Sequence, residues 1–148
     1  VIEADARWRL LAFAPAASAG QAGGAIDRLC AFLASDPASP VLRHTARGED
    51  VDAVIDLRAV FQQPFRALDY GAMPALLRPH VGRHGLRDYE KVFCVDHKSG
   101  VDIHALRGID RQAGCLVIVR PDQYVAQILP LDGQAALSAF FAGFLRRV

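Results

Sequence analysis

The chain has 148 residues, of which 52% are hydrophobic and 22% are charged, and its formal net charge is +1. This composition is typical of one soluble globular domain with a sizeable core, and a charge so close to neutral argues against nucleic acid or an anionic membrane as the main partner. No apolar run approaches the roughly 20 residues of a membrane-spanning helix, and the first residues lack the apolar segment of a signal peptide.

The first part of the chain predicts a strand, a helix and a second strand. Trp8 to Phe13 is a short apolar run, which predicts a buried strand. From Ala25 to Ala34 the apolar residues recur at i, i+3, i+4 and i+7, which predicts an amphipathic helix that the segment SDPASP ends. Val51 to Phe61 alternates apolar and charged residues, which predicts a half-exposed strand. Its charged side chains are expected to face solvent: Asp52, Asp56 and Arg58.

The middle of the chain is harder to assign. Gln62 to Glu90 has no sustained period and is punctuated by proline and glycine, so we expect irregular structure with a turn or two of helix near Ala72 to Leu77. Lys91 to Val95 predicts a further buried strand, and Asp102 to Leu106 a short helix.

Two apolar runs between Gly114 and Leu131 are separated by the pentapeptide RPDQY. Pro121 favours the first central position of a tight turn and Asp122 suits the second, which predicts a hairpin whose second strand restarts at Gln123 and Tyr124. Arg120 and Asp122 could instead recognise an anion or a partner's carboxylate. We favour the turn, with Arg120 pairing locally, because proline and aspartate each have a sufficient turn-forming role.

The chain ends in a predicted amphipathic helix from Asp132 to Arg147. Asp132 is expected to cap its N-terminus, and Arg146 and Arg147 to lie favourably at the C-terminal end of its dipole.

Neither thiol, metal nor hydrolase chemistry has a clear motif. Three cysteines lie far apart in apolar segments, as buried thiols of a reducing compartment do: Cys30, Cys94 and Cys115. Six side chains could be assembled into a metal site but form no four-ligand pattern, and we expect solvated histidines instead: His80, His84, His97 and His104, with Asp96 and Asp102. Ser18 lacks the GxSxG setting of a hydrolase nucleophile.

The order of these elements resembles the thioredoxin-like fold, with an α/β mixed sheet of about five strands, a C-terminal hairpin and flanking helices. The likeness is best over KVFCVDHKSGVDIHALRGI and CLVIVRPDQYV. The loop PAASAGQAGG, where thioredoxins carry a reactive cysteine at the start of the first helix, has none. Their cis-proline would fall near Ala113 to Cys115 and is missing as well.

A more specific resemblance rests on VRPDQYV, LRGID and FFAGFL. These segments are similar to the C-terminal domain of FAD-dependent aromatic hydroxylases of the phenol 2-monooxygenase and 3-hydroxybenzoate 4-monooxygenase type. The family fingerprint lies in the turn: Arg120, Pro121, Asp122, Gln123 and Tyr124. The resemblance implies a thioredoxin-like domain that follows the flavin and substrate domains, supports dimer formation and supplies no catalytic group.

Several expectations follow from that resemblance. Residues 1–148 would form one domain of a longer cytoplasmic flavoprotein that serves aromatic compound catabolism, and the start at Val1 with Met73 as the only methionine agrees with a fragment. The parent would hydroxylate a phenolic ring with FAD and NAD(P)H. No cofactor, metal or catalytic residue is expected in this chain itself. In particular, the segment GQAGGAID lacks the spacing of a flavin-binding GxGxxG motif.

The resemblance also implies two partners, a second copy of the chain and the parent's catalytic domains. Four aromatic residues are candidates for the dimer surface, three in the irregular stretch and one at the edge of the last helix's apolar arc: Phe61, Phe65, Tyr70 and Phe140. Two alternatives stay open: a divergent thiol peroxidase or oxidoreductase that uses one of the cysteines, and a free-standing domain that binds a small ligand.

Overall fold

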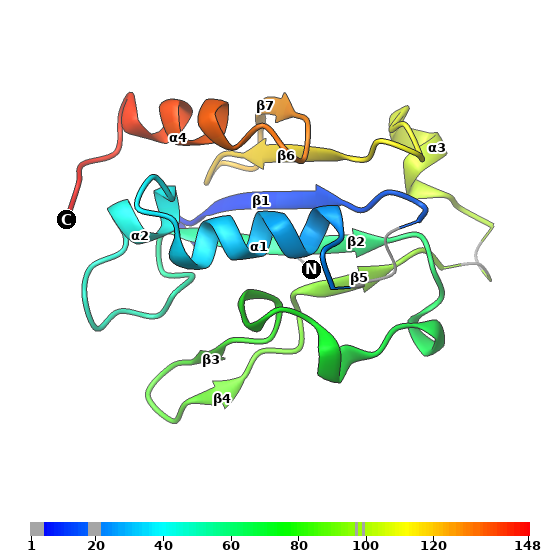
Figure 1. The fold of residues 1–148 in the computed structure, drawn as a ribbon, viewed down its shortest axis with the longest axis horizontal. Helices are drawn as coiled ribbons and strands as arrows, with labels where there is room; N and C mark the ends of the chain where they lie inside the picture. The colour runs from blue at the N-terminus through cyan, green and yellow to red at the C-terminus, as the bar shows by residue number, and fades with distance from the viewer. Residues whose placement is uncertain (1–4, 18–21, 97, 99) are drawn as a thin grey trace.

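The computed structural model describes residues 5–17, 22–96, 98 and 100–148, and its centre is a five-stranded mixed sheet in the order β5-β2-β1-β6-β7 (Figure 1). The strands are β1 (Trp8–Phe13), β2 (Ile55–Phe61), β5 (Val92–Cys94), β6 (Cys115–Val119) and β7 (Val125–Leu129). β2 runs parallel to both β1 and β5, whereas β6 is antiparallel to β1 and to β7. Together with the helices this is the thioredoxin-like α/β arrangement that the element order predicted.

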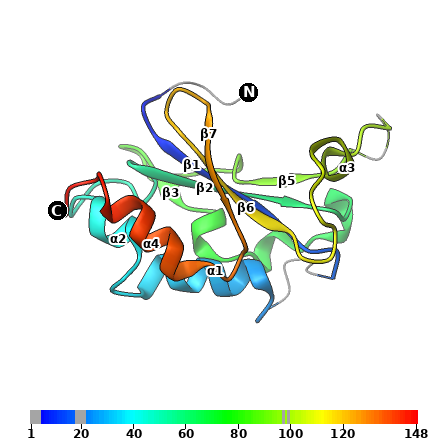
Figure 2. The same cartoon turned by 90° about the horizontal axis from the view of Figure 1, so that it is seen from above.

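The helices gather on one face of the sheet. In Figure 2 the same side of the sheet carries α1 (Ala25–Ser35), α2 (Pro40–His44) and α4 (Gln134–Ala142). The short α3 (Ile103–Arg107) lies at one end of the other side. The hydrophobic core fills the space between the sheet and the first group of helices, where Leu10, Leu33 and Phe141 are fully buried. The apolar spacing predicted for α1 places Ile26, Leu29 and Cys30 in this core.

The irregular stretch after β2 is confirmed. It contains three single turns of 3-10 helix, Phe65–Ala67, Tyr70–Ala72 and Ala75–Leu77, followed by a small separate hairpin of β3 (His80–Val81) and β4 (Leu86–Arg87). The proline and glycine residues that break the period explain why no longer element forms there.

The prediction of a half-exposed β2 is wrong. Its apolar residues do face the helices, but Asp52 before the strand and Asp56 and Arg58 within it are buried as well. Neighbouring charges of opposite sign surround these groups, so their burial is compensated by ion pairs and hydrogen bonds rather than by water.

Three further features differ from expectation. β5 is an edge strand rather than a buried one, and Phe93 is 40% exposed. The helix α2 was missed because its five residues are too short to display a period. α4 begins after Gly133, not Asp132, and ends at Ala142, so Arg146 and Arg147 lie beyond its last turn.

The β6–β7 hairpin is confirmed, with one correction in its turn. The Arg120 amide donates to the Tyr124 carbonyl at 2.8 Å, and the Gln123 amide donates to the Arg120 carbonyl at 2.9 Å. Gln123 has a φ of 70°, so it closes the turn in the left-handed region instead of restarting the strand, which begins at Val125.

Candidate interaction surface

The side of the sheet that faces away from α1, α2 and α4 has two contrasting halves, and we call it the open face. Arg9, Asp56 and Arg58 on β1 and β2 make one half charged. Val117, Val119 and Ile128 on β6 and β7 make the other half apolar. Since side chains alternate along a strand, the open face presents the positions between those that enter the core.

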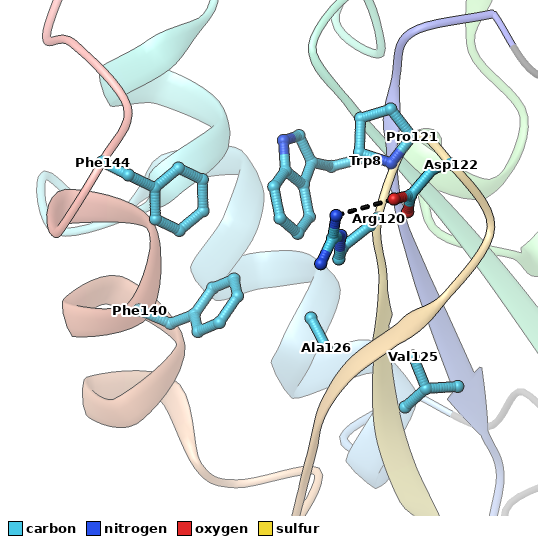
Figure 3. A pocket seen from close by; sticks show the side chains of 8 residues that line it. All are labelled: Trp8, Arg120, Pro121, Asp122, Val125, Ala126, Phe140 and Phe144. Carbon is cyan, nitrogen blue, oxygen red and sulfur yellow. Dashed lines mark hydrogen bonds and ion pairs between the residues drawn. The ribbon is translucent and has the colours of Figure 1, made fainter.

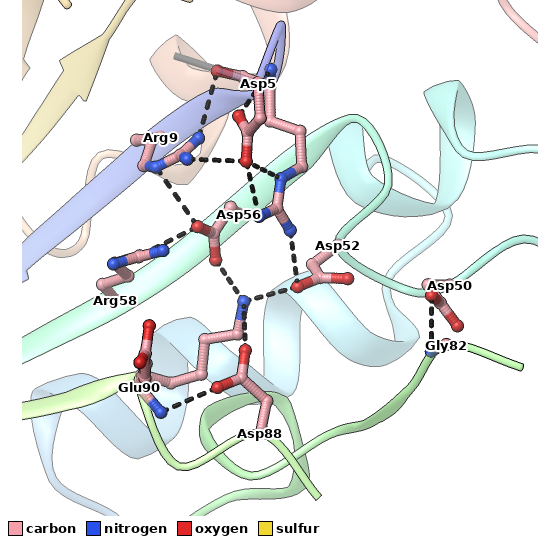
Figure 4. Close-up of polar contacts among 11 residues, drawn as sticks. Asp5, Arg9, Asp50, Asp52, Asp56, Arg58, Gly82, Asp88 and Glu90 are labelled. Atoms are coloured by element: carbon pink, nitrogen blue, oxygen red, sulfur yellow. Dashed lines mark hydrogen bonds and ion pairs between the residues drawn. The ribbon is translucent and has the colours of Figure 1, made fainter. Parts of the chain in front are cut away.

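The charged half is a network of ion pairs with a buried centre and a more exposed rim, shown in Figure 4. Its centre is Lys91, which is fully buried and whose Nζ contacts Asp52, Asp56 at 2.5 Å and Asp88 at 3.1 Å. The network contains four basic and four acidic side chains: Arg7, Arg9, Arg58 and Lys91, with Asp5, Asp52, Asp56 and Asp88. The opposite charges balance, as buried ionic groups require.

The pKa shifts in this network all favour the charged forms. Desolvation acts to lower the pKa of Lys91, but hydrogen bonds with Asp52 and Asp56 outweigh it and raise that pKa. The hydrogen bond from Arg9 holds the pKa of Asp5 well below its usual range. Because both shifts favour the charged forms, neither Lys91 nor Asp5 is poised to exchange a proton near neutral pH. The network therefore supports the fold rather than acid–base chemistry.

The apolar half of the open face is hollowed into a groove of about 510 Å³. Its walls come from β1, β6, β7 and α3, and its apolar lining residues are Leu11, Phe13, Ile103, Ile109, Cys115, Val117, Val119, Val125 and Ile128. Three polar side chains also line it: Arg9, Arg107 and Gln123. We call this feature the sheet groove.

β7 forms an apolar ridge beside the sheet groove. Val125 is 59% exposed and Ile128 is 63% exposed, and both side chains also line the groove. Sequence reasoning did not select either residue. The signal that could have identified them is the absence of charge from VAQIL. This last strand has no charged residue on either face, although it lies at the edge of the sheet.

The RPDQY turn borders a second groove of about 670 Å³, between the hairpin and α4 (Figure 3). Trp8, Phe140 and Phe144 form its aromatic wall, with Trp8 and Phe144 ring centroids 4.9 Å apart. The Arg120 guanidinium donates to the Asp122 carboxylate at 2.6 Å, and both side chains are about half exposed. This local pairing agrees with the turn interpretation, in which Arg120 pairs within the turn.

The four predicted interface residues have different environments. Phe61 ends β2 and is fully buried in the core, so the prediction that it contributes to a surface is wrong; its side chain follows the alternation of Leu57 and Ala59 toward the helices. Phe65 is 61% exposed. Tyr70 is half-buried, donates its hydroxyl to the Asp88 carbonyl at 3.2 Å and stacks on Tyr89. Phe140 is half-buried against Trp8.

The thiols are poorly placed for nucleophilic chemistry. Cys30 lies inside α1, and burial raises its pKa to about 12. Burial also raises the pKa of Cys94 and Cys115, which are half-buried. A raised pKa leaves little thiolate at neutral pH, so these are not the activated cysteines that a peroxidase needs.

The remaining candidates form no site among the residues described. No three His, Cys, Asp or Glu side chains in the described ranges lie together as a metal centre would require. His80 lies in β3, whereas His104 is buried beside Phe13. Ser18 and His97 fall outside the described residues. In that same part of the chain, no helix is long and apolar enough to cross a bilayer.

These observations define a class of protein: a thioredoxin-like domain with unactivated thiols, a buried ionic network and an open apolar surface. The chain belongs to the family described as phenol hydroxylase, C-terminal dimerisation domain, whose model matches residues 1–148. The resemblance carried by VRPDQYV is thereby confirmed.

Curated relatives agree with this membership. The chain is 54% identical over 145 residues to 3-hydroxybenzoate 4-monooxygenase of Comamonas testosteroni, covering 97% of this chain and 23% of that protein. It is 32% identical over 147 residues to a phenol 2-monooxygenase of Aspergillus fumigatus, covering 94% and 22%. It is 27% identical over 149 residues to an FAD-dependent monooxygenase of Aspergillus terreus, covering 99% and 24%. The chain thus spans about a quarter of the length of these relatives.

Proposed function

We propose that residues 1–148 are the non-catalytic C-terminal domain of an FAD-dependent phenolic hydroxylase and serve its dimerisation and assembly. The observation that carries this proposal is the apolar half of the open face, an uncovered groove beside an uncharged edge strand in a domain whose family is described by dimerisation. Apolar surface of this kind is a mark of protein association in soluble proteins.

The chemistry of the parent enzyme belongs to the same proposal. Relatives named as 3-hydroxybenzoate 4-monooxygenase, phenol 2-monooxygenase and FAD-dependent monooxygenase support an FAD enzyme acting on a phenolic ring, with NAD(P)H as the reductant. The flavin and substrate sites would lie in the parent's other domains, which this domain would contact. Three free thiols support a location in the reducing cytoplasm.

The competing thiol-enzyme hypothesis has no support in the described site. A thioredoxin or peroxidase stabilises its thiolate at the start of the first helix, where the helix dipole lowers the thiol pKa. Here Cys30 lies in the middle of α1, in the core, and its pKa of about 12 is shifted in the opposite direction.

Co-purification tests the proposed function. Two copies of the chain, one with an affinity tag and one without, are co-expressed and isolated through the tag. We expect the untagged copy to co-elute, and the purified material to show no flavin absorbance and to bind no added FAD. An untagged copy that never co-elutes contradicts a dimerisation role, and stoichiometric FAD binding contradicts a cofactor site elsewhere.

A further inference from the structure

We infer that the sheet groove and the β7 ridge together are the seat of a second copy of this chain, in a two-fold pairing that places the ridge of each copy in the groove of the other. This inference rests on the proposed function and deepens it, because it selects one surface and one occupant. The selected surface differs from the aromatic residues that the sequence suggested.

The first reason is that ridge and groove adjoin on one surface. Val125 and Ile128 project from β7 and at the same time border the groove floored by Leu11 and Val117. A two-fold interface must be self-complementary, since each patch meets its own copy. Exposed apolar side chains beside an apolar groove meet that condition, because one rotation can place the side chains of each copy in the groove of the other.

The second reason is the absence of charge along the strand. From Gln123 to Leu131 the sequence QYVAQILPL contains no charged residue. In a two-fold contact along a strand, a charge near the axis meets its own copy, and like charges opposite each other are destabilising. This strand avoids that penalty over its whole length.

The third reason is that the strand is not protected as sheet edges usually are. β7 is the last strand in the sheet order, and no described strand pairs with its outer edge. Edge strands are commonly shortened or carry charges that prevent association. The opposite edge strand, β5, has only three residues, and the fully buried Lys91 precedes it. β7 has five residues, four of them exposed, and its one irregularity is a register shift opposite Ile118 and Val119.

The groove beside the RPDQY turn is a weaker candidate for the same role. Its rim carries the Arg120–Asp122 ion pair, which would have to lose water on association. Its aromatic wall is already engaged, because the Trp8 ring contacts both Phe140 and Phe144 within the chain.

A pair of matched lysine substitutions tests the inference. Ile128→Lys places a charge in the proposed seat, and Leu86→Lys places the same charge on β4, outside it. Ile128 is 63% exposed and Leu86 is 69% exposed, and both lie in strands, so neither change should disturb the fold. Sedimentation equilibrium measures the dimer dissociation constant. We expect I128K to raise it by at least about 100-fold, because an unpaired charge would be buried, and L86K to leave it within about threefold.

Each outcome of this measurement has a distinct meaning. If I128K dimerises as tightly as L86K, the proposed seat is wrong while dimerisation stands. If Phe65→Lys dissociates the dimer and I128K does not, the seat lies on the irregular stretch instead. If the unmodified chain is monomeric at every concentration, the proposed function fails together with the seat.

Hydrogen exchange on the unmodified chain provides a second test that does not depend on a variant folding. The amides of Val125–Leu129 should exchange more slowly above the dissociation constant than below it, and those of Leu86–Arg87 should not change. Equal exchange of the β7 amides at both concentrations would overturn the inference.

Discussion

The two faces of the central sheet use the same strands in opposite ways. On the helix side, Leu10 of β1 and Leu57 of β2 enter a closed core beneath α1 and α4. On the open side, their neighbours Arg9 and Asp56 enter an ionic network that also fixes Lys91. One face is held by apolar packing within the chain, whereas the other is held in part by compensated charges and is in part uncovered.

This difference separates residues that stabilise the domain from residues available to a partner. A sheet with apolar side chains on both faces needs a cover on each, and among the described helices α1, α2 and α4 lie on one face whereas only the short α3 lies at an end of the other. The charged half of the open face needs no further cover, because its groups satisfy one another. The apolar half, around Val117, Val125 and Ile128, forms a groove that stays open to solvent. We therefore expect the apolar half to associate with a partner, and the charged half to contribute to the stability of the domain.

The largest expected effect on stability comes from breaking the ionic network. Lys91→Met removes the cation that Asp52, Asp56 and Asp88 share. The arginine partners of Asp52 and Asp56 remain, but the balance of charge around these buried carboxylates is lost. We expect a loss of about 3–5 kcal/mol in the free energy of unfolding, measured by urea denaturation. Lys98→Met changes an exposed lysine and serves as the control, with an effect within about 0.5 kcal/mol. Equal effects of the two variants would mean that the charges do not hold the open face together.

A smaller effect is expected where β1 and β6 meet. Gly114 has a φ of +65°, and a Cβ atom there would lie 2.2 Å from the Phe13 carbonyl oxygen. Gly114→Ala should therefore destabilise the chain by about 3 kcal/mol, from backbone strain and steric overlap combined. Gly82→Ala has a similar φ of +72° but free space around it, and should cost only about 1–2 kcal/mol. Similar thermal midpoints for the two variants would show that the close approach at Gly114 does not matter.

The smallest effect concerns His104, a residue of α3 that is buried with its ring centroid 5.5 Å from that of Phe13. Burial lowers the pKa of His104, because the charged imidazolium would lose its hydration in the core. Below about pH 6.5 the unfolded chain therefore binds more protons than the folded one, so stability falls as the pH drops. The slope attributable to this group is at most about 1.4 kcal/mol per pH unit.

Urea midpoints between pH 7.5 and pH 5 measure this dependence on His104. The variant His104→Phe should flatten the profile, whereas His80→Gln, at an exposed position, should leave it unchanged. A profile that is equally steep in the unmodified chain and in H104F would assign the dependence to other groups.

The sequence was sufficient for the elements whose signals are local. The helix α1 followed from apolar spacing, and the hairpin followed from Pro121 and Asp122, because each acts within a few residues of its own position. The end of α4 was misplaced, since the apolar residues after Ala142 continue the helical spacing although the helix stops there.

The open face could not be predicted, because its features depend on residues far apart in the chain. Asp56 looked solvent-exposed in an alternating strand, and only the approach of Arg9 and Lys91 explains its burial. Val125 and Ile128 looked like ordinary strand residues, and only the sheet order identifies them as the uncovered edge. Tertiary pairing of charges and the position of a strand in its sheet leave little trace in a single sequence.

The most direct test of the central claim is the solution mass of the unmodified chain, measured by multi-angle light scattering across a concentration series. A mass that rises to about twice 16.0 kDa and then stays constant is the predicted result, because a two-fold pairing closes at two copies. A constant mass of 16.0 kDa at every concentration would contradict a dimerisation surface in this domain.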